Sequence, residues 1–129
     1  MDVETLEGVR FFSGLSKEEL ERVAQWTDEV SVPESYALVR EGDFAHEFFV
    51  IEEGTAAVTH DGAVLAELGS GDFFGEIGLV RTRWRTASVV ASTPMRVIVM
   101  DEPSFRQMKR EMPAVADRIE AAIHARLDG

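Results

Sequence analysis

The residues best suited to chemistry lie in the segment 71–88. Glu76 stands between Gly75 and Gly78, and Arg85 follows nine residues after the glutamate. An ionised glutamate only accepts hydrogen bonds, so its natural partner is a hydroxyl donor such as a ribose 2′-OH. Arginine presents a planar, charged fork that matches phosphate oxygens. The segment therefore suits a small phosphorylated ligand with free hydroxyl groups.

The backbone of this segment also favours an anion. The glycines allow close approach, and we expect a short helix starting near Gly75 whose unpaired N–H groups would point at the ligand. A plainer alternative is that Glu76 and Arg85 form an ordinary surface ion pair, worth about 0–1 kcal/mol. We expect Arg81 and Arg83 to be solvated loop charges rather than ligands.

Short strands must position the segment, because apolar residues alternate from about residue 28 to residue 100. Asp61-Gly62 is typical of a type I′ hairpin turn, in which both residues need positive φ. About seven or eight strands with closely spaced turns predict an antiparallel sandwich or barrel. No helix-length segment separates them, which excludes an α/β fold. The runs are Val30–Val32, Leu38, Phe48–Ile51, Ala57–Val58, Val64–Leu65, Ala87–Val90 and Val97–Val99.

Both ends of the chain have helical periodicity. Ser16 and Glu19 have the spacing of a capping box. Pro113 stands where a first helical turn tolerates the missing N–H. The helix that follows carries a continuous apolar stripe. This stripe consists of Val115, Ile119, Ala122, Ile123 and Leu127.

Length and periodicity together predict one domain spanning residues 1–129. The chain has 129 residues, of which 45% are hydrophobic, which is ordinary for a globular domain. We expect a helical part at 1–27, a β-barrel at 28–100 that includes segment 71–88, and two helices in 101–129.

Composition excludes several classes of function. With 13 Lys+Arg against 24 Asp+Glu the net charge is −11, which argues against a direct nucleic-acid partner. There is no cysteine, which excludes disulfides and thiolate metal sites. No apolar run approaches the roughly 18–20 residues of a membrane span, and the acidic N-terminus is unlike a signal peptide. We therefore expect a cytoplasmic protein without a membrane partner.

At segment 71–88 the sequence resembles the cyclic nucleotide-binding domain family. The family's phosphate-binding cassette reads Phe-Gly-Glu-(Leu/Ile)-(Ala/Gly)-Leu and a hydrophobic residue, then a spacer and Arg-(Ser/Thr/Ala)-Ala. Residues 74–80 and 85–87 match it position by position. Trp84 departs from it, because the family often has proline there. Framework motifs extend the resemblance over nearly the whole chain, at 11–16, 40–43 and 48–54.

The resemblance implies a mainly β fold. This is an antiparallel jelly-roll β-barrel (double-stranded β-helix) with N-terminal helices and two C-terminal helices. It also implies that Glu76 accepts from the ribose hydroxyl and that Arg85 neutralises the cyclic phosphate. Arg126, late in the last helix, lies about where a lid over the base is expected, and a permanently docked helix with Arg126 in solvent is the alternative. The other implied binding residues are Phe74, Gly75, Ile77, Gly78, Leu79, Thr86 and Ala87.

The function implied is a non-enzymatic sensor that binds a 3′,5′-cyclic nucleotide, with cAMP favoured over cGMP. No other cofactor and no metal are expected, and the effector protein is not given by the resemblance. One alternative is a ligand-free interaction module on the same barrel. Another is a cupin-like metal enzyme, which is disfavoured because no two of the three histidines lie closer than fourteen residues.

Overall fold

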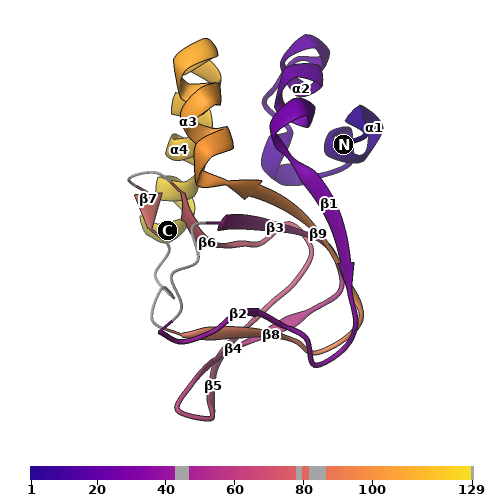
Figure 1. Ribbon diagram of the computed structural model, residues 1–129, viewed down its shortest axis with the longest axis vertical. Coiled ribbons are helices and arrows are strands. Elements are labelled where there is room, and N and C mark those ends of the chain that lie inside the picture. Colours follow the sequence, from indigo (N-terminus) through magenta and orange to yellow (C-terminus); the bar gives the residue numbers. More distant parts are fainter. Residues whose placement is uncertain (43–46, 78–79, 82–86, 129) are drawn as a thin grey trace.

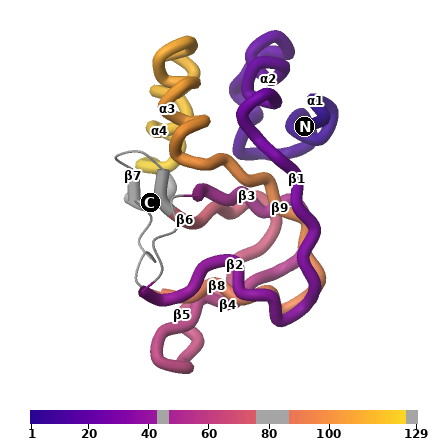
Figure 2. Tube along the Cα trace, in the orientation of Figure 1, coloured from indigo at the N-terminus to yellow at the C-terminus, as the bar shows by residue number. Residues whose placement is uncertain are grey.

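The computed structural model describes residues 1–42, 47–77, 80–81 and 87–128 (Figures 1 and 2). Two antiparallel sheets face one another, and the helices lie on the outer side of one of them. The strands are β1 (Asp28–Val32), β2 (Ala37–Val39), β3 (Glu47–Glu53), β4 (Ala56–His60), β5 (Ala63–Leu68), β6 (Phe73–Ile77), β7 (Val80–Arg81), β8 (Ser88–Ala91) and β9 (Met95–Asp101). The helices are α1 (Val3–Glu7), the 3₁₀ turns η1 (Arg10–Phe12) and η2 (Ala24–Trp26), α2 (Lys17–Val23), α3 (Glu102–Glu111) and α4 (Pro113–Asp128).

The fold has two hydrophobic cores, and strand β3 contributes side chains to both. The five-stranded sheet runs β1-β9-β3-β6-β7, and the four-stranded sheet runs β2-β8-β4-β5. Successive side chains of β3 point to opposite faces. Phe48 and Val50 join the core beneath the helices, whereas Phe49 and Ile51 join the core between the sheets. Strand β3 thus packs against the helices with one face and against the four-stranded sheet with the other.

The predicted mainly β, jelly-roll class is confirmed. No ladder among the described strands joins the two sheets, so the barrel is a two-sheet roll rather than a closed ring. Asp61 (φ 50°) and Gly62 (φ 81°) both have positive φ, as the type I′ turn requires. Ser16 and Glu19 form both hydrogen bonds of the predicted capping box.

The expected short helix starting near Gly75 is wrong. Residues 73–77 form β6, which pairs with β3 through Phe49↔Phe74 and Phe48↔Gly75. At its far end Ile77 pairs with Val80 of β7. The ladder with β3 satisfies the backbone groups that a helix would have satisfied internally.

Helix α4 packs through its apolar stripe. Val115, Ile119 and Ile123 are buried in the core beneath the helices, together with Leu6 and Phe12 from the N-terminal part. Figure 1 shows α3 and α4 above the five-stranded sheet, beside α2. None of the described helices combines the length and apolar character needed to span a membrane.

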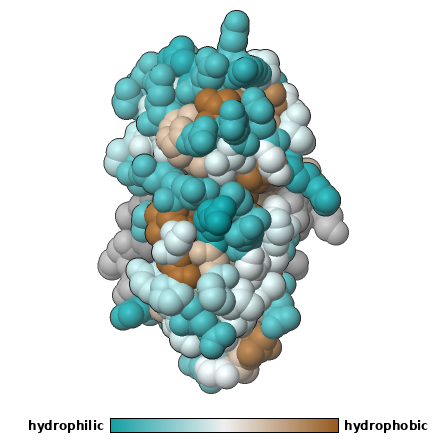
Figure 3. Space-filling view, turned by 90° about the vertical axis from the view of Figure 1, so that its right-hand side faces the viewer, coloured by the Kyte–Doolittle hydropathy of each residue, from teal (hydrophilic) through white to brown (hydrophobic). Residues whose placement is uncertain are grey.

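The face of the molecule drawn in Figure 3 is mostly hydrophilic. Figure 3 shows the face on the right of Figure 1, where hydrophobic residues form separate patches among polar ones. Four large hydrophobic side chains of the described residues are exposed, namely Val30, Tyr36, Val64 and Leu65. Some exposed apolar side chains are normal for a globular fold.

Candidate functional site

The start of segment 71–88 is fixed to the five-stranded sheet. The N–H of Gly71 donates to the carbonyl oxygen of Ile51 at 2.8 Å, and the N–H of Ile51 donates to that of Asp72 at 2.8 Å. The Asp72 carboxylate accepts from the N–H of Gly69 at 2.7 Å, closing the turn before β6. These bonds set the direction in which the chain enters β6.

Gly75 occupies a position that only glycine fits. Its φ is +99°, a region that side chains disfavour. A Cβ atom on this residue would lie 2.2 Å from the carbonyl oxygen of Glu47 in β3. The backbone of β6 therefore approaches β3 very closely just before Glu76.

The structure describes part of the predicted site. The backbones of Glu76 and Ile77 end β6, opposite Arg81 and Val80. For these two residues and for Arg126, which lies within α4, the structure describes the backbone only. Four further predicted site residues lie outside the described residues, namely Gly78, Leu79, Arg85 and Thr86.

Two predicted site residues contribute to the core between the sheets. The Phe74 ring is fully buried and stacks on Phe49, with centroids 4.8 Å apart. Ala87 is 2% exposed and belongs to the same cluster. Since packing occupies both side chains, what these residues can offer a ligand is their backbone groups.

The far end of the segment is fixed to the four-stranded sheet. Ser88 begins β8 opposite Thr59 of β4. Its hydroxyl accepts from the N–H of Glu41 at 3.0 Å, which ties the turn after β2 to the end of the segment. Segment 71–88 thus leaves one sheet and enters the other. No local pattern predicts this contact of Glu41 with Ser88, because the two residues meet across 47 residues of chain.

A cleft of about 220 Å³ is lined by residues of β1, β9 and β3 and by Tyr36 and Leu38. Asp28 and Glu47 also line it. Two carboxylates make this cleft a poor place for a phosphate, because like charges repel. A phosphorylated ligand would need the cation that segment 71–88 carries.

One carboxyl group of β3 has an unusual environment. Burial and the nearby carboxyl of Glu29 raise the pKa of Glu52 from 4.5 to about 7, with Arg96 opposing the shift. One carboxylate oxygen of Glu52 is buried and has no hydrogen-bond partner among the described groups. Arg96 lies 3.6 Å from the other oxygen.

The described histidines do not form a cupin-like centre. His60 ends β4 and His124 lies on α4, and both are exposed. Neither faces the core between the sheets, where a metal enzyme of that type would gather its ligands. His46 lies outside the described residues.

Comparison with known proteins agrees with this architecture. The chain is 33% identical over 104 residues to the cAMP-dependent protein kinase regulatory subunit of Schizosaccharomyces pombe. The match covers 80% of this chain but only 25% of that relative, so the chain spans about a quarter of its length.

Solved structures share the fold. A putative cyclic nucleotide-binding protein from Geobacter metallireducens superposes with a TM-score of 0.81 at 24% identity, covering 97% of this chain and 94% of the other. The catabolite activator protein of Thermus thermophilus gives 0.74 at 27% identity, covering 92% and 58%. The family model described as "Cyclic nucleotide-binding domain" matches residues 29–111. Because this match covers more than half of the chain, the chain belongs to the cyclic nucleotide-binding domain family.

Proposed function

We propose that this chain is a non-enzymatic sensor domain that binds a 3′,5′-cyclic nucleotide in segment 71–88. The observation that carries the proposal is the glycine geometry at residue 75. The backbone at Gly75 has a positive φ and lies so close to β3 that a Cβ atom would clash with the Glu47 carbonyl, immediately before the only glutamate of the segment. The family's cassette places its Gly-Glu pair at this point of the sequence.

Each end of the ligand has a partner in the proposal. Glu76 accepts a hydrogen bond from the ribose 2′-OH, and Arg85 neutralises the cyclic phosphate. Backbone N–H groups of Gly75, Ile77 and Ala87 contribute to the same shell. Gly78, Leu79 and Thr86 complete it.

We favour cAMP over cGMP. The curated relative is named as a regulatory subunit of a cAMP-dependent kinase, which supports this preference. Thr86 offers a hydroxyl near the phosphate that could also reach a guanine amino group, so it does not decide between the two bases.

The last turns of α4 act as the lid in this proposal, with Arg126 near the base. The sheets provide a rigid frame, and a helix end that closes on the ligand would carry the signal to an effector. Ligand shifts such a helix only through contacts that differ between the open and closed states.

Calorimetric titration with 3′,5′-cAMP and 3′,5′-cGMP tests the proposal. We expect saturable binding of cAMP with one site per chain, weaker binding of cGMP, and weaker binding of 2′-deoxy-cAMP than of cAMP. A cGMP dissociation constant well below that of cAMP would reverse the base preference. If neither nucleotide binds or raises the melting temperature, the chain is instead a ligand-free interaction module.

A further inference from the structure

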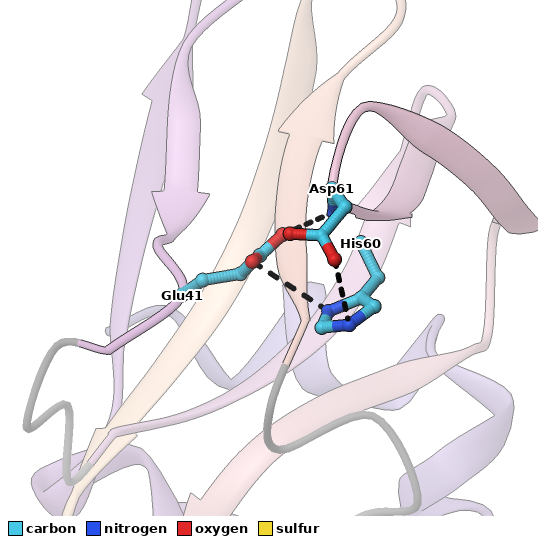
Figure 4. Close-up of side chains that lie close together, drawn as sticks. All are labelled: Glu41, His60 and Asp61. Carbon is cyan, nitrogen blue, oxygen red and sulfur yellow. Dashed lines mark hydrogen bonds and ion pairs between the residues drawn. The ribbon is translucent and has the colours of Figure 1, made fainter.

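A cluster of three metal-ligating side chains lies at the tip of the β4–β5 hairpin, outside segment 71–88. His60 ends β4, Asp61 is the first turn residue, and Glu41 follows β2 (Figure 4). One ligating atom from each side chain lies within 4.8 Å of the other two. The side chains of Glu41, His60 and Asp61 are 33%, 50% and 85% exposed, so ions in solution can reach them.

Both nitrogens of the imidazole face carboxylate oxygens. His60 Nδ1 lies 3.5 Å from Glu41 Oε2, and Nε2 lies 3.4 Å from Asp61 Oδ2. A neutral imidazole has one N–H and one lone pair, so one of these contacts would set a lone pair against an anion. A metal ion bound to that nitrogen would remove this repulsion.

The spacing of the ligating atoms suits a metal ion. Two ligand atoms at about 2.1 Å from a tetrahedral zinc lie about 3.4 Å apart, because the angle between them is about 109°. The His60–Asp61 contact has this separation. The longest separation in the cluster, up to 4.8 Å, must shorten by more than an ångström, which exposed side chains allow.

Part of the cluster is fixed before any ion arrives. The N–H of Asp61 donates to Glu41 Oε1 at 3.2 Å, and the N–H of Glu41 donates to the Ser88 hydroxyl at 3.0 Å. Glu41 Oε2 is thereby left facing His60. The net charge of −11 further raises the local concentration of cations.

We propose that Glu41, His60 and Asp61 form a surface site for a borderline divalent metal ion such as Zn²⁺, with water completing its coordination. One imidazole nitrogen with two carboxylates favours Zn²⁺, Cu²⁺ or Ni²⁺ over Mg²⁺ and Ca²⁺, which prefer oxygen ligands alone. The ion would join the β4–β5 hairpin to the end of β2. The sequence spacing did not predict this site, because Glu41 lies nineteen residues before His60.

Zn²⁺ titration of untagged, metal-free protein tests the proposal by calorimetry. We expect one Zn²⁺ per chain, reversal by EDTA, and no comparable binding of Mg²⁺. His60→Ala should weaken binding by more than the roughly tenfold cost of losing an outer-shell partner. Asp61→Asn and Glu41→Gln should each weaken it as well, while asparagine still tolerates the positive φ of residue 61.

His124→Ala is the matched control, since His124 is the other exposed histidine of the described chain. This variant should bind Zn²⁺ as the wild type does. Melting curves without metal check that each variant folds, and Zn²⁺ should raise the melting temperature of wild type but not of His60→Ala. Equal Zn²⁺ affinity in wild type and His60→Ala, or no binding by the wild type, would overturn the proposed metal site.

Discussion

The guanidinium of Arg118 in α4 donates a hydrogen bond to the carboxylate of Glu19 in α2. A second nitrogen of Arg118 donates to the carbonyl oxygen of Gly14 at 3.1 Å. The other carboxylate oxygen of Glu19 accepts from the N–H of Ser16 at 2.9 Å, as part of the capping box. Hydrogen bonding to Ser16, and then to Arg118, lowers the pKa of Glu19. One glutamate thus caps its own helix and fastens α4 to the N-terminal part.

Replacing Arg118 by alanine should loosen α4 without unfolding the domain. The pair is partly exposed, so we expect only a small fall in the melting temperature. Hydrogen exchange should accelerate in α4, because a local tether is lost while the buried stripe remains. Arg106→Ala is the control, since it removes an exposed pair with Glu102 within α3. Equal exchange rates in α4 for both variants would mean that Arg118 does not fasten the helix.

The sequence predicted local features better than distant contacts. The capping box and the Asp61-Gly62 turn depend on residues that are adjacent or three apart, so their spacing was sufficient. The expected helix near Gly75 failed because pairing of β6 with β3, 27 residues away, overrode the local pattern. The contact of Glu41 with His60 likewise arises only when β2 and the β4–β5 hairpin are brought together by the sheet.

Gly75→Ala should destabilise the fold strongly. Both the positive φ and a Cβ atom 2.2 Å from the Glu47 carbonyl oxygen oppose any side chain here. We expect a loss on the order of 3 kcal/mol in the free energy of unfolding, measured by urea denaturation. Gly71→Ala separates the two causes, because Gly71 has φ +90° and nothing within 4 Å of the added Cβ. Equal losses in the two variants would show that backbone strain alone decides the cost.

Arg85→Ala should remove most nucleotide affinity while the protein stays folded. A cyclic phosphate in a protein of charge −11 needs a local cation. Losing a charge-assisted, bidentate contact costs about 2–5 kcal/mol, or roughly 30-fold to several-thousand-fold in the dissociation constant. Arg85→Lys should recover part of this, since lysine lacks the planar fork. Arg81→Ala and Arg83→Ala change the net charge equally and should bind cAMP nearly as the wild type does. A dissociation constant unchanged in Arg85→Ala would refute the cassette assignment.

Stability should depend on the ionisation of Glu52. Its pKa is about 7 in the folded protein and near 4.5 when solvated, so the folded state holds this proton more tightly. The contribution of Glu52 to stability is therefore full below pH 4.5 and is lost as pH rises through 7. The groups facing it are Glu29 on β1, Arg96 on β9 and its neighbour Glu53.

Glu52→Gln removes this ionisation. Relative to wild type, the variant should be more stable by about 1–3 kcal/mol at pH 8, and the difference should nearly vanish at pH 4. Glu53→Gln is the control, because that side chain is 67% exposed and also lies near Arg96. Urea denaturation at both pH values provides the measurement. A stability difference for Glu52→Gln that does not change with pH would mean that its carboxyl titrates normally.

The end of α4 should respond to nucleotide. Val115, Ile119 and Ile123 are already buried, so that part of the helix has little protection left to gain. His124 and Ala125 are exposed, and a lid would therefore close through residues 124–128. We expect saturating cAMP to slow hydrogen exchange there more than in residues 113–123, and deletion of residues 124–129 to weaken cAMP binding. The Arg85→Ala variant, at the same cAMP concentration, should show no such slowing, which separates a ligand effect from a solvent effect. Exchange that stays unchanged in residues 124–128 of the saturated wild type would mean that α4 is permanently docked and does not report the nucleotide.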